Sequence, residues 1–204
     1  MIVYIIVLST FAYVLSKTFP AIYLNEKKNA IEQGKQLLTE NEEVGRFPVL
    51  AIVMFTMPVL IFFLSENMLL SSFCFILSVV AYTDLSARWI PDFTIYLLLV
   101  VAMLSLRTTD LILSIWSVLF YLMPALLFSA YGYVLNKETW IASGDYYVFP
   151  SIGSMVFPQY AAGLMFTNLL LVILISRWVP KVPLVTIAFI TFTGYQICIL
   201  SDVL

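Results

Sequence analysis

Residues 111–135 read LILSIWSVLFYLMPALLFSAYGYVL, a run of 25 positions without a single charged side chain. A helix of about 20 apolar residues is long enough to cross the hydrocarbon core of a bilayer. The whole chain has the same character, since 62% of its 204 residues are hydrophobic and 11% are charged. Soluble domains average about 25% charged residues. The sequence therefore predicts a polytopic membrane protein.

Further apolar runs lie on both sides of this stretch. Together with it they occupy residues 1–24, 47–64, 68–83, 93–106, 111–135, 146–158, 160–176 and 182–200. We predict an all-α integral-membrane helical bundle of about eight transmembrane helices, with six or seven as alternatives. It would form one domain, 1–204, in which the polar stretch 25–46 is a short cytoplasmic loop. The two shortest runs are expected to line a cavity or to thin the bilayer.

The positions of the basic residues predict how the chain is oriented, because lysine and arginine near spans stay on the cytoplasmic side. In the eight-span topology nine of the ten basic residues share one side, and only Arg107 lies on the other. The nine are Lys17, Lys27, Lys28, Lys35, Arg46, Arg88, Lys137, Arg177 and Lys181. We therefore expect a multi-pass protein of the inner (plasma) membrane with both termini external.

The reactive side chains available in the sequence are few. There is no histidine, which excludes a His-Glu-x-x-His metalloprotease and a serine–histidine arrangement. Cys74 and Cys198 stand alone in separate apolar runs, so we expect no metal site. We expect no organic cofactor either, because hydrolysis by a pair of carboxyls needs none. No basic tract indicates a nucleic-acid partner. Carboxylates remain as the acid–base groups.

Two aspartates stand where an apolar run meets a polar break. Asp84 follows the run 68–83, and Asp145 precedes the run 146–158. Two spans separate them, so both are predicted to face the cytoplasm. Two carboxyls that converge at a bilayer edge can share a proton and activate a water, which indicates an intramembrane aspartic hydrolase. The alternatives are that Asp84 is a solvated loop carboxylate and that Asp145 only caps the helix that follows it.

The residues after Asp84 complete a segment that reads DLSARWIPD, residues 84–92. Pro91 disfavours helix at Ile90, which predicts a break after the helix that carries Asp84. Arg88 either pairs with Asp84 one helical turn away or anchors at lipid headgroups. Asp92 is expected to cap the next helix.

The residues before Asp145 read ASGD, residues 142–145. Gly144 is expected to let the backbone approach a neighbouring helix closely just before Asp145.

These two segments resemble the type IV prepilin peptidase family, a group of GxGD-type intramembrane aspartic proteases that includes preflagellin leader peptidases. In that family an aspartate ends a span and is followed by a basic residue and Ile-Pro-Asn/Asp. The matching positions here are Asp84, Arg88, Ile90, Pro91 and Asp92.

The family's second aspartate closes a Gly-x-Gly-Asp motif, to which Gly144 and Asp145 correspond, with Ala142 in place of the first glycine. Val182 and Pro183 are similar to the family's closing Ile-Pro segment.

The resemblance implies that the chain removes the leader peptide from type IV prepilin-like precursors, with Asp84 and Asp145 as the catalytic pair. The substrate would be another membrane helix that reaches the enzyme within the lipid bilayer. Members that also methylate the new amino terminus carry two cysteine pairs in the first cytoplasmic loop, and residues 25–46 contain none. We therefore expect peptidase activity alone.

Two other functions remain open. The first is a small membrane transporter or an ion or proton channel that uses the same aspartates. No acidic residue lies in the middle of an apolar run, however, where transport sites usually lie. The second is a non-catalytic assembly factor in which both aspartates are structural. Cleavage activity with purified components separates these alternatives.

Overall fold

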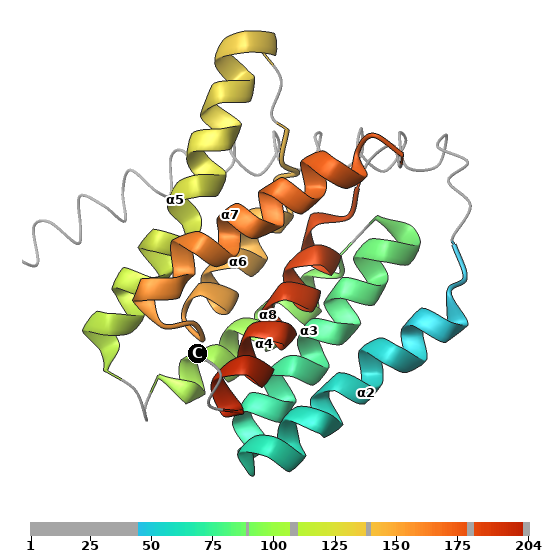
Figure 1. The fold of residues 1–204 in the computed structure, drawn as a ribbon, viewed down its shortest axis with the longest axis vertical. Coiled ribbons are helices and arrows are strands. Elements are labelled where there is room, and N and C mark those ends of the chain that lie inside the picture. Colours follow the sequence, from blue (N-terminus) through green and yellow to red (C-terminus); the bar gives the residue numbers. More distant parts are fainter. Residues whose placement is uncertain (1–44, 89, 107–109, 138–139, 179–181, 202–204) are drawn as a thin grey trace, which may run out of the picture. The chain divides into compact units, whose positions relative to one another are not determined.

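A computed structural model of the chain describes residues 45–88, 90–106, 110–137, 140–178 and 182–201. The predicted span 1–24, and all of the stretch 25–46 except its last two residues, lie outside the described residues. The described residues form seven α-helices and no strand, which confirms the predicted all-α class (Figure 1). The helices are α2 (Pro48–Ser65), α3 (Met68–Ala87), α4 (Asp92–Ser105), α5 (Leu111–Asn136), α6 (Asp145–Gly153), α7 (Pro158–Ile175) and α8 (Leu184–Leu200).

Four of these helices, α2, α3, α5 and α7, are long and apolar enough to cross a membrane, and α4 and α8 are shorter apolar helices. The prediction of about eight spans therefore exceeds what the described residues show. The difference is clearest at the predicted run 146–158, where α6 has nine residues. At 1.5 Å per residue it is about 14 Å long, roughly half the thickness of the hydrocarbon core.

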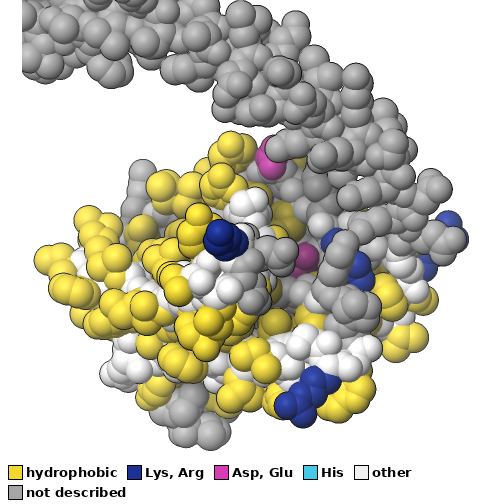
Figure 2. Space-filling model, turned by 90° about the horizontal axis from the view of Figure 1, so that it is seen from above, with side chains coloured by type: hydrophobic (Ala, Val, Ile, Leu, Met, Phe, Trp, Pro, Cys, Tyr) yellow, Lys and Arg dark blue, Asp and Glu magenta, His cyan; other side chains and the backbone are white. Residues whose placement is uncertain are grey.

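The surface of the described bundle is apolar on its sides, as contact with lipid requires. Large side chains on the outer helices are strongly exposed, including Phe63 of α2 at 75% and Val134 of α5 at 78%. Figure 2 shows one end of the bundle, where hydrophobic side chains cover most of the described surface and charged side chains are few. Such a surface is stable in a bilayer and would be an aggregation hazard in water.

Helix α8 lies at the centre of the packing. It contacts α3 on one side and α7 on the other, and it also reaches α2 and α6 (Figure 1). Phe192 of α8 is fully buried, and its ring packs against that of Phe73 of α3 with the centroids 5.4 Å apart. Its N-terminal residues are buried as well, so the start of α8 lies inside the bundle beside the end of α3.

A polar network joins three helices inside the bundle. The Asn168 side-chain amide on α7 donates a hydrogen bond to the Tyr121 hydroxyl on α5 over 3.1 Å. The Thr191 hydroxyl on α8 contacts the Asn168 side-chain oxygen. Tyr121 and Asn168 are fully buried, so these bonds satisfy polar groups that have no access to water.

Candidate active site

Asp84 is a buried residue in the last turn of α3, with 7% of its surface exposed. The helix continues to Ala87, and Arg88 closes it in a left-handed conformation with φ 51°. The Arg88 N–H donates to the Asp84 carbonyl over 3.0 Å. Asp84 is therefore not a solvated loop carboxylate, because the helix extends beyond the point at which the apolar run ends.

Asp145 is equally buried, at 7% exposure, and is the first residue of α6. The N-cap position is Gly144, so Asp145 lies one residue inside the helix. The backbone N–H of Asp145 donates to the Ala142 carbonyl in the preceding turn over 3.2 Å. The alternative in which Asp145 only caps a helix that begins at Tyr146 is therefore wrong.

Both aspartates lie at the same end of the bundle. The chain leaves this end after Asp84, crosses along α4, returns along α5 and reaches Asp145 (Figure 1). Asp145 begins the short α6, which is not one of the helices long enough to cross a membrane. Burial, and then the nearby negative charge of Asp84, raise the pKa of the Asp145 carboxyl from its ordinary value of 3.8 to about 7. The two carboxyls are thus close enough to interact, and at neutral pH both cannot be fully charged.

The start of α8 contacts Asp84 directly. The Thr186 N–H donates to Asp84 Oδ2 over 3.2 Å, and Thr186 Oγ1 lies 3.4 Å from the same oxygen. The Thr186 hydroxyl also donates to the Ala81 carbonyl over 2.8 Å. Sequence reasoning missed Thr186. The available signal was Pro183, which stands at the N-cap of α8 three residues earlier.

The residues that follow Asp84 form the predicted break between α3 and α4. Pro91 has an extended backbone with ψ 129°, and Ile90 is half-buried against the hydrophobic core. Arg88 is exposed, and its charge attracts Asp84. Arg88 stands one helical turn beyond Asp84, at the C-cap of α3, where its N–H closes the last turn.

The expected role of Asp92 as a helix cap is wrong. The N-cap of α4 is Pro91, and Asp92 is the exposed first residue of the helix, without a capping hydrogen bond. The Thr94 hydroxyl donates to the Pro91 carbonyl over 2.6 Å, which ties the first turn of α4 to the residue before it. The helix therefore starts at Asp92, one residue before the predicted run 93–106.

The expected role of Gly144 is also wrong. Its φ is −61°, and a Cβ placed on it would have no atom within 4 Å, so neither backbone freedom nor a close approach requires glycine here. The close approach lies at the other end of α6. A Cβ on Gly153 would stand 3.0 Å from the Val118 Cα and 3.1 Å from the Tyr121 Cβ of α5.

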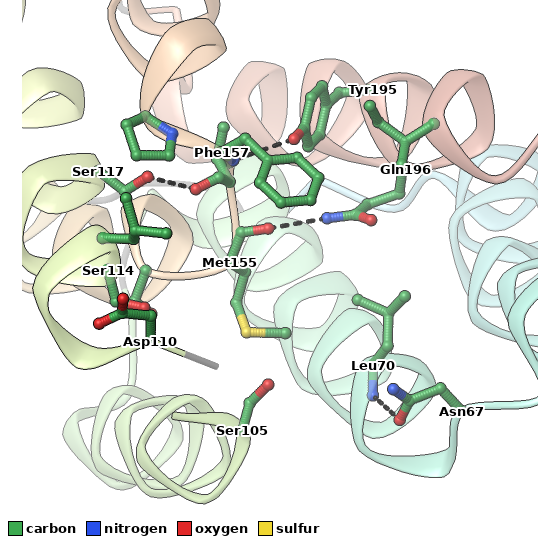
Figure 3. A pocket seen from close by; sticks show the side chains of 15 residues that line it. Asn67, Leu70, Ser105, Asp110, Ser114, Ser117, Met155, Phe157, Tyr195 and Gln196 are labelled. Atoms are coloured by element: carbon green, nitrogen blue, oxygen red, sulfur yellow. Dashed lines mark hydrogen bonds between the residues drawn. The ribbon is translucent and has the colours of Figure 1, made fainter. Parts of the chain in front are cut away.

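Residues at the opposite end of the bundle line a cavity of about 380 Å³ (Figure 3). Asn67, Ser105 and Asp110 line it at the ends of α3, α4 and α5 that are far from the aspartates. Residues 154–158, between α6 and α7, form another part of its wall. The last residues of the predicted run 146–158 therefore line a cavity, but they lie after the end of α6, and no residue of α6 itself is part of the lining.

Polar side chains hold the connection between α6 and α7 in place beside this cavity. The Gln196 side-chain amide donates to the Met155 carbonyl over 3.0 Å, and the Phe157 N–H donates to the Tyr195 hydroxyl over 3.0 Å (Figure 3). The Ser117 hydroxyl contacts the Val156 carbonyl. Within the described ranges, no group of three or more cysteine or carboxylate side chains is placed to hold a metal ion.

One comparison with known proteins gives a match. Residues 71–193 match the model of the type IV leader peptidase family, a region that contains both aspartates and Thr186 and spans more than half of the chain. No curated protein and no solved structure matches the chain.

Proposed function

The chain belongs to the type IV leader peptidase family, and from that premise we propose that it is an intramembrane aspartic endopeptidase that removes the leader from type IV prepilin-like precursors. The observation that carries the proposal is the pair of buried carboxyls, Asp84 and Asp145, at one end of the bundle and within electrostatic reach of each other. Asp84 is not a carboxylate in a solvated loop, and Asp145 is not the N-cap of α6, so neither alternative accounts for the two aspartates.

Two interacting carboxyls supply the two proton transfers that peptide hydrolysis needs. One carboxylate takes a proton from a water, and the water oxygen attacks the carbon of the scissile carbonyl. The other carboxyl, which carries a proton, donates it to the carbonyl oxygen. The raised pKa of Asp145 favours a protonated acid in the pair at neutral pH. The pair titrates as a unit.

The basic residues support a cytoplasmic active site. Arg88 closes α3, Lys137 closes α5 and Arg177 follows α7, so all three lie at the end of the bundle that carries the aspartates. Basic residues next to spans favour the cytoplasmic side. A precursor with a basic leader and an apolar helix would place the junction between these two parts at the depth of Asp84 and Asp145. The substrate we propose is such a membrane-embedded precursor.

The test is cleavage of a prepilin precursor in membranes that carry the wild-type protein, Asp84→Asn or Asp145→Asn, with protein amounts matched by immunoblot. We expect both variants to lose at least about 1,000-fold in rate, because each removes one of two coupled proton-transfer groups. Asp110→Asn is the matched control. It makes the same change at the N-cap of α5, where asparagine caps as well as aspartate. Normal processing by either dyad variant would refute the proposal.

A further inference from the structure

Asp84 caps a helix to which it does not belong. The first N–H groups of a helix have no partner within it, and the N-cap residue of α8, Pro183, has no side chain that can accept a hydrogen bond. Asp84 Oδ2 accepts the Thr186 N–H in its place, and the Val185 N–H also interacts with this carboxylate. Backbone N–H groups and the positive end of the helix dipole both favour a negative charge at this position.

The Thr186 hydroxyl sets how the two helices meet. It donates to the carbonyl of Ala81, one helical turn before Asp84 on α3. One residue of α8 therefore holds the last turn of α3 at two points, through its hydroxyl at Ala81 and its N–H at Asp84. The hydroxyl bond fixes the position from which the N–H reaches the carboxylate.

Asp145 has a different environment. Within the described part of the chain its carboxyl accepts no hydrogen bond, and burial and the charge of Asp84 both act against its ionised form. The charged groups that act on Asp84 have opposite effects, since Arg88 attracts its negative charge and Asp145 repels it. A single negative charge shared by the pair is therefore more stable on Asp84.

We propose that Thr186 is a positioning residue that directs the negative charge of the pair onto Asp84, which makes Asp84 the general base and Asp145 the general acid. This inference rests on the proposed aspartic peptidase function. Asp84 takes a proton from the attacking water as its oxygen bonds to the carbonyl carbon, and Asp145 protonates the carbonyl oxygen. The C–N bond then breaks. Asp84 passes its proton to the departing nitrogen, and Asp145 regains a proton from a hydroxyl of the intermediate.

The test compares three substitutions on α8. Thr186→Val removes the hydroxyl and keeps the branched shape, and Thr186→Ser keeps the hydroxyl. Thr193→Val is the matched control, because Thr193 is also buried and its hydroxyl donates only to carbonyls of its own helix. The readout is the pH profile of kcat/KM for cleavage of a prepilin precursor, normalised to the amount of folded protein.

For Thr186→Val we expect kcat/KM to fall about 10-fold and the acid limb of its pH profile to move up by about 0.5 to 1 pH unit, with the basic limb unchanged. If the Asp84 carboxylate loses about 1 kcal/mol of stabilisation, its protonation shifts by roughly that many pH units. Thr186→Ser and Thr193→Val should keep the wild-type profile. If Thr186→Val does not accumulate, Thr186→Ala provides the same comparison, because it removes the same hydroxyl without adding volume.

A second readout needs no substrate. Infrared titration of the carboxyl C=O band in purified protein follows protonation of the pair directly, and Thr186→Val should take up its proton at higher pH than the wild type. An unchanged infrared titration would overturn the inference. So would an unchanged pH profile in an enzyme whose two dyad variants are inactive. If the wild type cleaves no precursor, the proposed function fails, and the infrared titration still decides whether Thr186 directs the charge.

Discussion

Gly153 of α6 lies directly against Val118 of α5, so closely that a Cβ on Gly153 would stand 3.0 Å from the Val118 Cα. A contact this short with a backbone atom can be relieved only by moving one helix. Because α6 begins at Asp145, a shift of α6 also shifts one of the two carboxyls.

Gly153→Ala should therefore impair both stability and activity. We expect a loss of about 1–3 kcal/mol in the free energy of unfolding, as for other overpacked contacts, and a lower rate of precursor cleavage. Thermal unfolding in detergent and the cleavage assay measure the two effects. Gly163→Ala is the control, since a Cβ there would have no atom within 4 Å. Equal stability of the two variants would contradict the close approach.

Asn168→Leu tests the polar network between α5, α7 and α8. It removes the bonds of Asn168 with Tyr121 and Thr191, while the Thr191 hydroxyl keeps its contacts with the Ile187 and Ala188 carbonyls. We expect a loss of about 1 kcal/mol, typical of interhelical hydrogen bonds in membranes. A double-mutant cycle with Tyr121→Phe measures the pair directly. A coupling energy of zero would show that the Asn168–Tyr121 bond contributes nothing to stability.

Tyr195→Phe tests the connection between α6 and α7. The hydroxyl of Tyr195 accepts the Phe157 N–H, and this partly buried donor would lose its acceptor. We expect a loss of about 1 kcal/mol in the free energy of unfolding, the net contribution of a typical hydrogen bond. Tyr160→Phe is the matched control, because its ring packs against that of Tyr195 with the centroids 5.8 Å apart. Chemical or thermal unfolding in detergent measures the difference. The prediction fails if the two variants unfold alike.

The stability of the protein should depend on pH through Asp145. Its pKa is raised on folding from 3.8 to about 7, so between these values the folded state binds more protons than the unfolded state. Stability is then greatest below about pH 4, falls as pH rises, and stays constant above about pH 7, with a total change of up to about 4 kcal/mol. Asp145→Asn removes this contribution.

The measurement is the melting temperature in detergent from pH 4 to pH 8 for the wild type and Asp145→Asn. The melting temperature of the wild type should fall more steeply with pH than that of the variant. Asp92→Asn is the control, because Asp92 is exposed. Parallel curves for the wild type and Asp145→Asn would show that Asp145 is not buried at this end of the bundle.

Hydropathy along the chain was enough to predict the all-α class and the approximate positions of the long helices. The run 68–83 corresponds to α3 and the run 111–135 to α5. These features are local, because a continuous apolar segment in lipid must satisfy its own backbone hydrogen bonds as a helix. The two aspartates were found in the same way, as carboxylates at the edges of apolar runs.

The division between the runs 146–158 and 160–176 was predicted, but the point at which α6 ends could not be read from hydropathy, because apolar residues continue beyond Gly153. Ser117 and Tyr195, from two other helices, satisfy the backbone at Val156 and Phe157 and so permit the break. The role of Thr186 likewise depends on a partner 102 positions away. Composition and local pattern determine which segments form helices in a membrane, whereas the tertiary structure decides where short helices end and which buried groups meet, because those bonds join residues far apart in the chain.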